Sequence, residues 1–351
     1  MRFSPIPNSE SDDMGILDVK NLYIHYRTLR GKVRAVDGIT FSIAEGESLG
    51  LVGESGCGKT TLGKALLRLL PENAAIERGE ILFRGRDLVR ISPQEMRAIR
   101  GKEIAMVPQS AMNALDPVYR IKDLIIEGML VHKEVADEAN DSRIAELFSS
   151  VGLEGSRIDN YPHMFSGGMR QRAVIAGVFS LRPSLIIADE PTTALDVIVQ
   201  DQVLKQLAAL ISETHATLIA ITHDIGIVAE NCQKTGVMYA GKLVEIGPTE
   251  EALGEPFHPY TMGLQNALLG VRDERREIIS IPGVPPSLIE PPAGCRFHPR
   301  CPFASAPCSE EEPMLEEVSP GHFAACHYRQ AAPEMRGLAK DPERWLKEKT
   351  S

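Results

Sequence analysis

Short apolar runs alternate with longer amphipathic stretches along most of the chain. Runs typical of buried strands stand at 48–53 (SLGLVG), 184–190 (SLIIADE) and 217–223 (TLIAITH). A long amphipathic pattern at 197–213 predicts a helix. Strands that alternate with helices in this way predict an α/β fold with a largely parallel sheet that is covered on both faces.

Two regions interrupt this alternation and predict further subdomains. β-prone runs dominate residues 16–43, which indicates an N-terminal antiparallel β subdomain. Helical periodicity returns repeatedly between about residues 110 and 180, which predicts a helical subdomain. The predicted division is a flexible N-terminus at 1–14, a main domain at 15–255, a C-terminal extension with four cysteines at 256–330 and a polar tail at 331–351.

Composition narrows the class of protein. The formal net charge of −10 argues against a nucleic-acid partner, because a sequence-independent binder would show a basic footprint. No apolar run approaches the roughly 18 residues of a membrane helix, and the first residues lack the apolar core of a secretory signal. We therefore expect a cytosolic chain, in which clustered cysteines indicate metal more often than disulfides.

A phosphate-binding pattern, G-x-x-x-x-G-K-[ST], is formed by Gly53, Gly58, Lys59 and Thr60. The glycines let the backbone approach phosphates closely, the lysine reaches the β- and γ-phosphates, and the threonine hydroxyl ligates Mg²⁺. Cys57 is interpreted as a small residue that fits the loop; the alternative is a thiol whose pKa is lowered by the helix N-terminus. The other residues expected to contact the nucleotide here are Glu54, Ser55, Gly56 and Thr61.

Polar residues also end three more predicted strands. Asp189 and Glu190 end SLIIADE, where the first can hold Mg²⁺ through water and the second can deprotonate an attacking water. His223 ends TLIAITH and Gln109 ends KEIAMVPQ. We expect both to meet a γ-phosphate or its metal ion.

Residues 16 to about 255 resemble the ATP-binding subunit of an ABC transporter, which is a P-loop NTPase. GESGCGKTT matches the Walker A motif, VPQ the Q-loop, SLIIADE the Walker B motif, TTALD the D-loop and ITHD the H-switch. The resemblance implies ATP hydrolysis with Glu190 as catalytic base, with His223 and Gln109 as γ-phosphate and metal sensors, and with Mg²⁺ held by Thr60 and Gln109. It also implies that Tyr26 stacks on adenine; the alternative is an ordinary strand tyrosine.

FSGGM, at 165–169, resembles the ABC signature LSGGQ, with Phe165 in place of leucine and Met169 in place of glutamine. The core of the signature, Ser166, Gly167 and Gly168, is intact and opens a predicted helix whose N-terminus suits an anion. The resemblance implies that two ATP-binding domains pair head to tail. Each signature would then grip the nucleotide on the partner's P-loop, and Asp196 of the D-loop would reach across.

The C-terminal sequence resembles the extension of bacterial dipeptide and oligopeptide importer ATPases. The matching stretches are PFHPYTMGLQNALLG at 256–270 and IPGVPPSLIEPPAGCRFHPRCPFASAPC at 281–308. The resemblance implies a peripheral subunit on the cytoplasmic face of the inner membrane. Its expected partners are two integral membrane permeases, an extracytoplasmic solute-binding protein and a second ATPase, which is a paralogue or an identical copy.

Two alternatives to peptide import stay open. One is the same importer role with nickel, glutathione or an oligosaccharide as cargo. The other is a soluble ABC ATPase with no role in transport.

Four late cysteines, Cys295, Cys301, Cys308 and Cys326, are spaced C-x₅-C-x₆-C-x₁₇-C. Four thiolates suit a [4Fe–4S] cluster or Zn²⁺, and unmetallated thiols are a third alternative. The resemblance to the importer group implies the iron–sulfur cluster. Three histidines lie among these cysteines and are expected to be surface residues: His298, His322 and His327.

Overall fold

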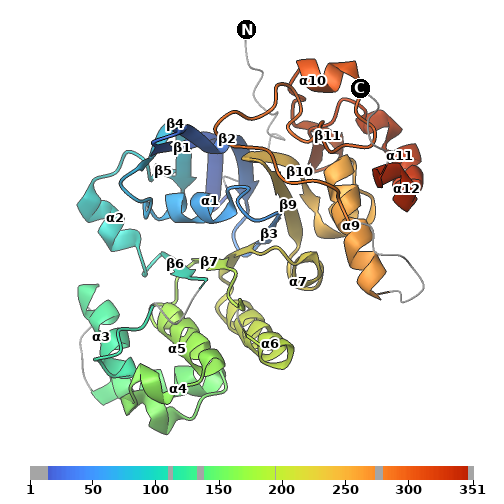
Figure 1. The fold of residues 1–351 in the computed structure, drawn as a ribbon. Coiled ribbons are helices and arrows are strands. Elements are labelled where there is room, and N and C mark those ends of the chain that lie inside the picture. Colours follow the sequence, from blue (N-terminus) through green and yellow to red (C-terminus); the bar gives the residue numbers. More distant parts are fainter. Residues whose placement is uncertain (1–14, 110–113, 133–137, 194, 273–279, 347–351) are drawn as a thin grey trace. The chain divides into compact units, whose positions relative to one another are not determined.

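The chain forms two compact units in a computed structural model (Figure 1). The first unit comprises residues 1–44, 48–89 and 222–351, and the second comprises 45–47 and 90–221. The structure describes residues 15–109, 114–132, 138–193, 195–272 and 280–346. The predicted flexible segment 1–14 lies outside them, and the domain boundaries drawn from the sequence stay predictions.

An antiparallel sheet occupies one part of the first unit and confirms the predicted N-terminal β subdomain. Its strands run in the order β2–β1–β4–β5. Both neighbours of β1 are antiparallel to it. The strands are β1 (Leu17–Thr28), β2 (Gly31–Ile43), β4 (Ala74–Phe83) and β5 (Arg86–Asp87).

The rest of the first unit is built around the strand that precedes the Walker A sequence. This strand, β3 (Ser48–Val52), pairs in parallel with β9 (Lys234–Tyr239), and β9 forms a hairpin with β10 (Lys242–Pro248). The helices of this region are α1 (Lys59–Leu66), α7 (Ile225–Asn231), α8 (Thr249–Gly254) and α9 (Pro259–Arg272).

The C-terminal segment adds two strands to this part of the first unit. Strand β12 (His322–Ala324) pairs with β10, and β11 (Glu316–Ser319) pairs with β12. Trp345, in the predicted polar tail, is buried, and its indole N–H donates to the carbonyl of Ala339 at 2.9 Å. The remaining elements are α10 (Ala306–Glu310), η4 (Arg329–Ala331), α11 (Ala332–Leu338) and α12 (Pro342–Leu346).

The second unit contains three parallel strands in the order β8–β7–β6 and most of the long helices (Figure 1). Its apolar core joins these strands to the helices, with Phe148 and Phe165 packed edge to face at 6.5 Å between ring centroids. The parallel strands and the helical region near 110–180 agree with the sequence-based expectation. The elements are α2 (Pro93–Ile99), β6 (Ile104–Val107), α3 (Ile121–Val131), α4 (Glu138–Ser150), η2 (Gly155–Asp159), η3 (Pro162–Met164), α5 (Gly167–Phe179), β7 (Leu185–Asp189), α6 (Val197–Thr214) and β8 (Thr217–Ile221).

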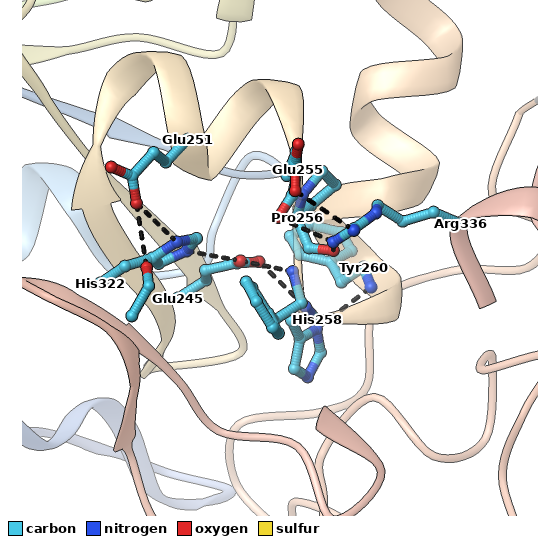
Figure 2. A network of polar contacts seen from close by, with 10 residues as sticks. Glu245, Glu251, Glu255, Pro256, His258, Tyr260, His322 and Arg336 are labelled. Atoms are coloured by element: carbon cyan, nitrogen blue, oxygen red, sulfur yellow. Dashed lines mark hydrogen bonds and ion pairs between the residues drawn. The ribbon is translucent and has the colours of Figure 1, made fainter. Parts of the chain in front are cut away.

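A buried glutamate joins the C-terminal segment to the rest of the first unit (Figure 2). The Glu245 carboxylate, on β10, accepts the backbone N–H groups of Phe257 at 2.6 Å and His258 at 3.0 Å, just before α9. It also binds Nε2 of His322 on β12 at 2.9 Å, and both side chains are fully buried. Three donors compensate the cost of burying this carboxylate, so the start of α9 and strand β12 are fixed to β10.

We expect Glu245→Ala to lower the free energy of unfolding by about 3–5 kcal/mol, because it leaves buried polar partners of a charged group unpaired. The control is Glu251→Ala, since the Glu251 carboxylate lies 3.9 Å from Nδ1 of His322 but its side chain is 50% exposed. That change should cost less than about 1 kcal/mol. Urea unfolding of both variants measures the difference, and equal costs would contradict the assignment.

Candidate functional site

The P-loop between β3 and α1 is shaped by glycines that contact backbone carbonyls. Gly53 has φ 149° and Gly58 has φ 111°, both in the left-handed half of the backbone map. A Cβ atom would come within 2.1 Å of the carbonyl oxygen of Met238 at the first position and of Ala35 at the second. At Gly56, by contrast, a Cβ would meet nothing within 4 Å. The loop is therefore pressed against the protein at its two ends and open in its middle.

Lys59 lies inside this loop. Its amine donates to the carbonyl oxygens of Gly53 at 2.7 Å and Glu54 at 3.1 Å, and the side chain is 5% exposed. The lysine therefore lies against the backbone of the loop, and its contact with phosphate oxygens stays a prediction. Within the described residues, no side chain caps the N-terminus of α1 at Gly58, which suits an anion at this position.

Cys57 is a buried residue of the P-loop. Its side chain is 4% exposed, and burial raises the pKa of the thiol even though Lys59 opposes that shift. The alternative of a lowered thiol pKa is therefore wrong, because desolvation outweighs the helix N-terminus and the neighbouring cation. The interpretation as a small residue that fits the loop agrees with the structure.

Tyr26, on β1, is brought to the P-loop helix. Its hydroxyl lies 3.0 Å from the hydroxyl of Thr61, within hydrogen-bonding distance. The ring is half-buried. Stacking of this ring on adenine stays a prediction.

The second unit positions the predicted catalytic base at the end of β7. Glu190 follows Asp189, the last residue of the strand, and has φ 45°, a conformation that is unusual for a residue other than glycine. Its Oε2 accepts hydrogen bonds from Nε2 of Gln109 and from the hydroxyl of Thr193, both at 3.0 Å. Asp189 is 2% exposed. The structure thus brings Gln109 and Glu190 together, and the contribution of Thr193 was not evident from the sequence.

His223 follows β8 by two residues and stands in the turn before α7, within the first unit. The imidazole is exposed. The turn is fixed on either side, since the Thr222 hydroxyl accepts the N–H of Asp224 at 3.0 Å and Asp224 caps α7. Its role as γ-phosphate sensor stays a prediction.

The signature residues open helix α5. Ser166 is the N-cap, and its hydroxyl accepts the N–H of Met169 at 3.3 Å; Ser166 and Gly167 are exposed. A Cβ at Gly168 would come within 2.3 Å of Val199 on α6, so only glycine allows this approach of the two helices.

The two departures from LSGGQ have a structural explanation. Phe165 is 3% exposed and fills the core against Phe148, while Met169 packs against the same core. Asp196 of the D-loop is the N-cap of α6, with its carboxylate 3.0 Å from the N–H of Val199.

The four late cysteines line one small cavity of about 20 Å³ in the first unit. All are free thiols, and burial raises the pKa of Cys295 to about 11, of Cys326 to about 12 and of Cys301 well above its ordinary value. Among the described residues, no three or more His, Cys, Asp or Glu side chains are arranged to hold a metal ion. Cys308 completes the set that surrounds the cavity.

The surface interpretation of the interleaved histidines is wrong for His322, which is fully buried against Glu245. No local pattern predicts this burial, because the acid that pairs with His322 stands 77 residues away along the chain. Nδ1 of His298 lies 2.9 Å from the carbonyl of Cys295, and Nε2 of His327 lies 2.9 Å from the carbonyl of Glu311.

Two residues that contact the P-loop were not recognised in the sequence. Arg300 binds both carboxylate oxygens of Glu54, and the hydroxyl of Tyr260 accepts the Glu54 backbone N–H. Tyr260 belongs to the stretch PFHPYTMG, which was noted only for its resemblance to importer ATPases. No local sequence pattern predicts a contact of Arg300 with the P-loop.

Curated relatives share most of the chain. It is 45% identical to the dipeptide transport ATP-binding protein DppD of Lactococcus lactis, over 88% of this chain and 89% of that protein. It is 40% identical to the DppD protein of Escherichia coli, over 90% of this chain and 97% of that one. The chain belongs to the ABC transporter family.

Family models match both parts of this ABC protein. The ABC transporter model covers residues 36–193, which include the P-loop, the signature and Glu190. The model of the oligopeptide/dipeptide transporter C-terminal region covers residues 244–308, which include Tyr260 and Arg300.

Solved ABC structures support the fold. A bacterial ABC transporter cassette, MJ0796, solved as a dimer, matches with a TM-score of 0.60 and 25% identity, over 66% of this chain and 98% of that one. The cbiO1 protein of Clostridium perfringens, part of the cbiONQ ABC transporter complex, matches with a TM-score of 0.60 and 27% identity, over 74% and 96% of the two chains. These matches confirm the ABC-type P-loop fold. Among the described helices, none combines the length and apolar character that a membrane span requires.

We expect Thr193→Val to lower kcat for ATP hydrolysis about fivefold with little change in KM, because Glu190 loses a hydrogen-bond donor that orients its carboxylate. Thr193→Ser, which keeps the hydroxyl, should retain wild-type turnover. Steady-state phosphate release measures both variants. Equal kcat values for the valine and serine variants would mean that the bond does not orient Glu190.

Proposed function

We propose that the chain is the ATP-hydrolysing subunit of an importer for dipeptides and oligopeptides. The observation that carries the proposal is the identity of 40–45% to transport ATP-binding proteins named for dipeptides and oligopeptides, over about nine-tenths of the chain. The match to the oligopeptide/dipeptide transporter C-terminal region favours peptide over nickel, glutathione or oligosaccharide as cargo. It also disfavours a soluble ABC ATPase with no role in transport.

ATP binding uses the backbone amides of the P-loop and the amine of Lys59. When ATP binds, this amine moves from the carbonyls of Gly53 and Glu54 to the β- and γ-phosphates. Thr60, Gln109 and Asp189 supply the oxygen atoms that Mg²⁺ prefers. When bound, the metal ion neutralises charge on the β- and γ-phosphates.

Hydrolysis uses Glu190 as general base. Its carboxylate takes a proton from the water that attacks the γ-phosphorus, and the bond to the β-phosphate oxygen breaks to leave ADP and phosphate. Gln109 and Thr193 orient this carboxylate through Oε2. His223 senses the γ-phosphate.

The signature acts on the nucleotide of a second ATPase subunit. Ser166 and Gly167 are exposed at the N-terminus of α5, so they can meet a phosphate from outside the chain. The MJ0796 cassette is dimeric in its solved structure. In the proposed head-to-tail pair, the γ-phosphate holds the two subunits together and its hydrolysis releases them, with Asp196 reaching the partner.

The remaining partners are two membrane permeases and an extracytoplasmic solute-binding protein, which the importer role requires. The ATPase would act at the cytoplasmic face of the inner membrane as a peripheral subunit. The second ATPase is a paralogue or an identical copy.

We also propose that Cys295, Cys301, Cys308 and Cys326 hold a [4Fe–4S] cluster. Four cysteines around one cavity suit a cluster, in which each thiolate binds a different iron. Zn²⁺ held by the same four thiolates is the alternative. The cavity of about 20 Å³ has room for about one water, so the surrounding loops must open to admit a cluster.

Glu190→Gln tests the catalytic role. We expect kcat to fall at least about a hundredfold while the Kd for ATP stays unchanged, because the amide keeps the shape of the side chain but accepts no proton. The ATP-bound variant should accumulate as a dimer in size-exclusion chromatography. The matched control is Glu213→Gln, at an exposed position of α6, which should hydrolyse ATP normally. Turnover of Glu190→Gln at the wild-type rate would remove Glu190 from its role.

Iron analysis tests the cluster. Protein purified without oxygen should contain about four irons per chain and absorb near ~400 nm. Cys301→Ser should lose the iron, whereas Cys232→Ser, a buried cysteine outside the cavity, should keep it. A colourless wild-type protein, or one zinc per chain, would overturn the assignment.

A further inference from the structure

Two residues of the C-terminal segment converge on one residue of the P-loop. The guanidinium of Arg300 donates to both carboxylate oxygens of Glu54, at 2.7 and 2.9 Å. The hydroxyl of Tyr260 accepts the backbone N–H of Glu54 at 2.9 Å. We propose that Tyr260 and Arg300 are positioning residues for ATP binding, because they hold the P-loop in its phosphate-accepting shape through Glu54. The inference rests on the proposed function of the chain as an ATPase.

Arg300 is held by other residues besides Glu54. Its Nε donates to the carbonyl of Pro282 at 2.8 Å, Nη2 donates to that of Ile281 at 3.2 Å, and Nη1 lies 3.2 Å from the hydroxyl of Tyr239. The side chain is 7% exposed. Bidentate contact from a side chain held on this many sides fixes direction as well as distance, and burial reduces its screening by salt.

Tyr260 is held with equal rigidity. Its side chain is fully buried, and its ring packs against Tyr239 and Phe297 at centroid distances of 4.6 and 5.3 Å. Its backbone N–H donates to Nδ1 of His258 at 3.1 Å, at the start of α9. Burial lowers the pKa of His258 to about 3, so this ring is neutral and can accept the bond. Glu245 anchors the same turn to β10 (Figure 2).

Every polar group of Glu54 is engaged. Besides the contacts to its carboxylate and N–H, its carbonyl oxygen accepts the Lys59 amine at 3.1 Å and the N–H of Cys57 at 3.2 Å. Glu54 therefore links the C-terminal segment to the lysine that binds phosphate. A loop ordered in this way before binding loses less conformational freedom when ATP arrives, which raises affinity.

The contacts predict an effect on ATP affinity rather than on the chemical step. Tyr260 and Arg300 belong to the first unit, whereas the residues assigned to water activation belong to the second: Glu190, Gln109 and Thr193. Loss of the contacts of Tyr260 and Arg300 with Glu54 should therefore raise KM and Kd for ATP and leave kcat near the wild-type value.

The test uses Tyr260→Phe and Arg300→Lys in the full chain. The first removes only the hydroxyl, and the second keeps the positive charge but not the bidentate fork. We expect each to raise Kd and KM for ATP about tenfold with kcat changed less than about twofold. Hydrogen exchange of the amides at 53–58 should become faster in both variants, while iron content and melting temperature stay close to wild type.

A double-mutant cycle isolates the Arg300–Glu54 contact. Glu54→Gln keeps the shape of a side chain that is 27% exposed, and adding it to Arg300→Lys should raise Kd little further. The matched control is Arg336→Lys, another arginine of the C-terminal segment, which bonds to Glu255 and Pro256 and not to the P-loop (Figure 2). It should leave Kd, KM and loop exchange unchanged.

The outcomes separate this inference from the proposed function. A wild-type chain that does not bind ATP would remove the proposed function. If the wild type binds ATP and Glu190→Gln blocks turnover, while Tyr260→Phe and Arg300→Lys keep wild-type Kd and loop exchange, the positioning role alone is overturned. Lower melting temperatures with unchanged Kd would likewise overturn it, because they would assign both residues to stability only.

Discussion

The close approach of backbone to backbone at the two ends of the P-loop is the constraint on which the nucleotide site depends. Gly53 and Gly58 lie against the carbonyl oxygens of Met238 and Ala35 at distances that no Cβ atom could tolerate. These two contacts hold the ends of the loop against the neighbouring strands, and the backbone N–H groups between them are expected to face a phosphate. The loop is thus a product of its glycines and of the strands that support it, since β2 and β9 supply the two carbonyls.

The second unit contributes groups of a different kind. Glu190, Gln109 and Thr193 form a small polar cluster at the end of a buried strand, and Ser166 is exposed at the N-terminus of helix α5. The core beneath them is apolar and well packed, with Phe165 and Met169 facing inward. The two residues that depart from the usual signature therefore pack against the core, and Ser166 and Gly167 at the start of the helix stay exposed.

The C-terminal segment is integrated into the first unit by buried polar contacts. Glu245 binds two backbone amides and a histidine, and Arg300 and Tyr260 both bind Glu54. Polar bonds between distant segments specify one arrangement more sharply than apolar contact alone, because each donor must find its acceptor. Residues of the predicted C-terminal extension are therefore in direct contact with the P-loop.

The α/β fold, the P-loop sequence, the expected base Glu190 and the signature could all be predicted from the amino-acid sequence, because these predictions depend on short runs of residues with a fixed spacing. Only the tertiary structure decided that His322 is buried, that Thr193 supports Glu190 and that Arg300 reaches Glu54, which is 246 residues away. The last contact has no local signature in the chain. It exists because the fold brings Arg300 and Glu54 together, and a sequence pattern records spacing along the chain rather than contacts in space.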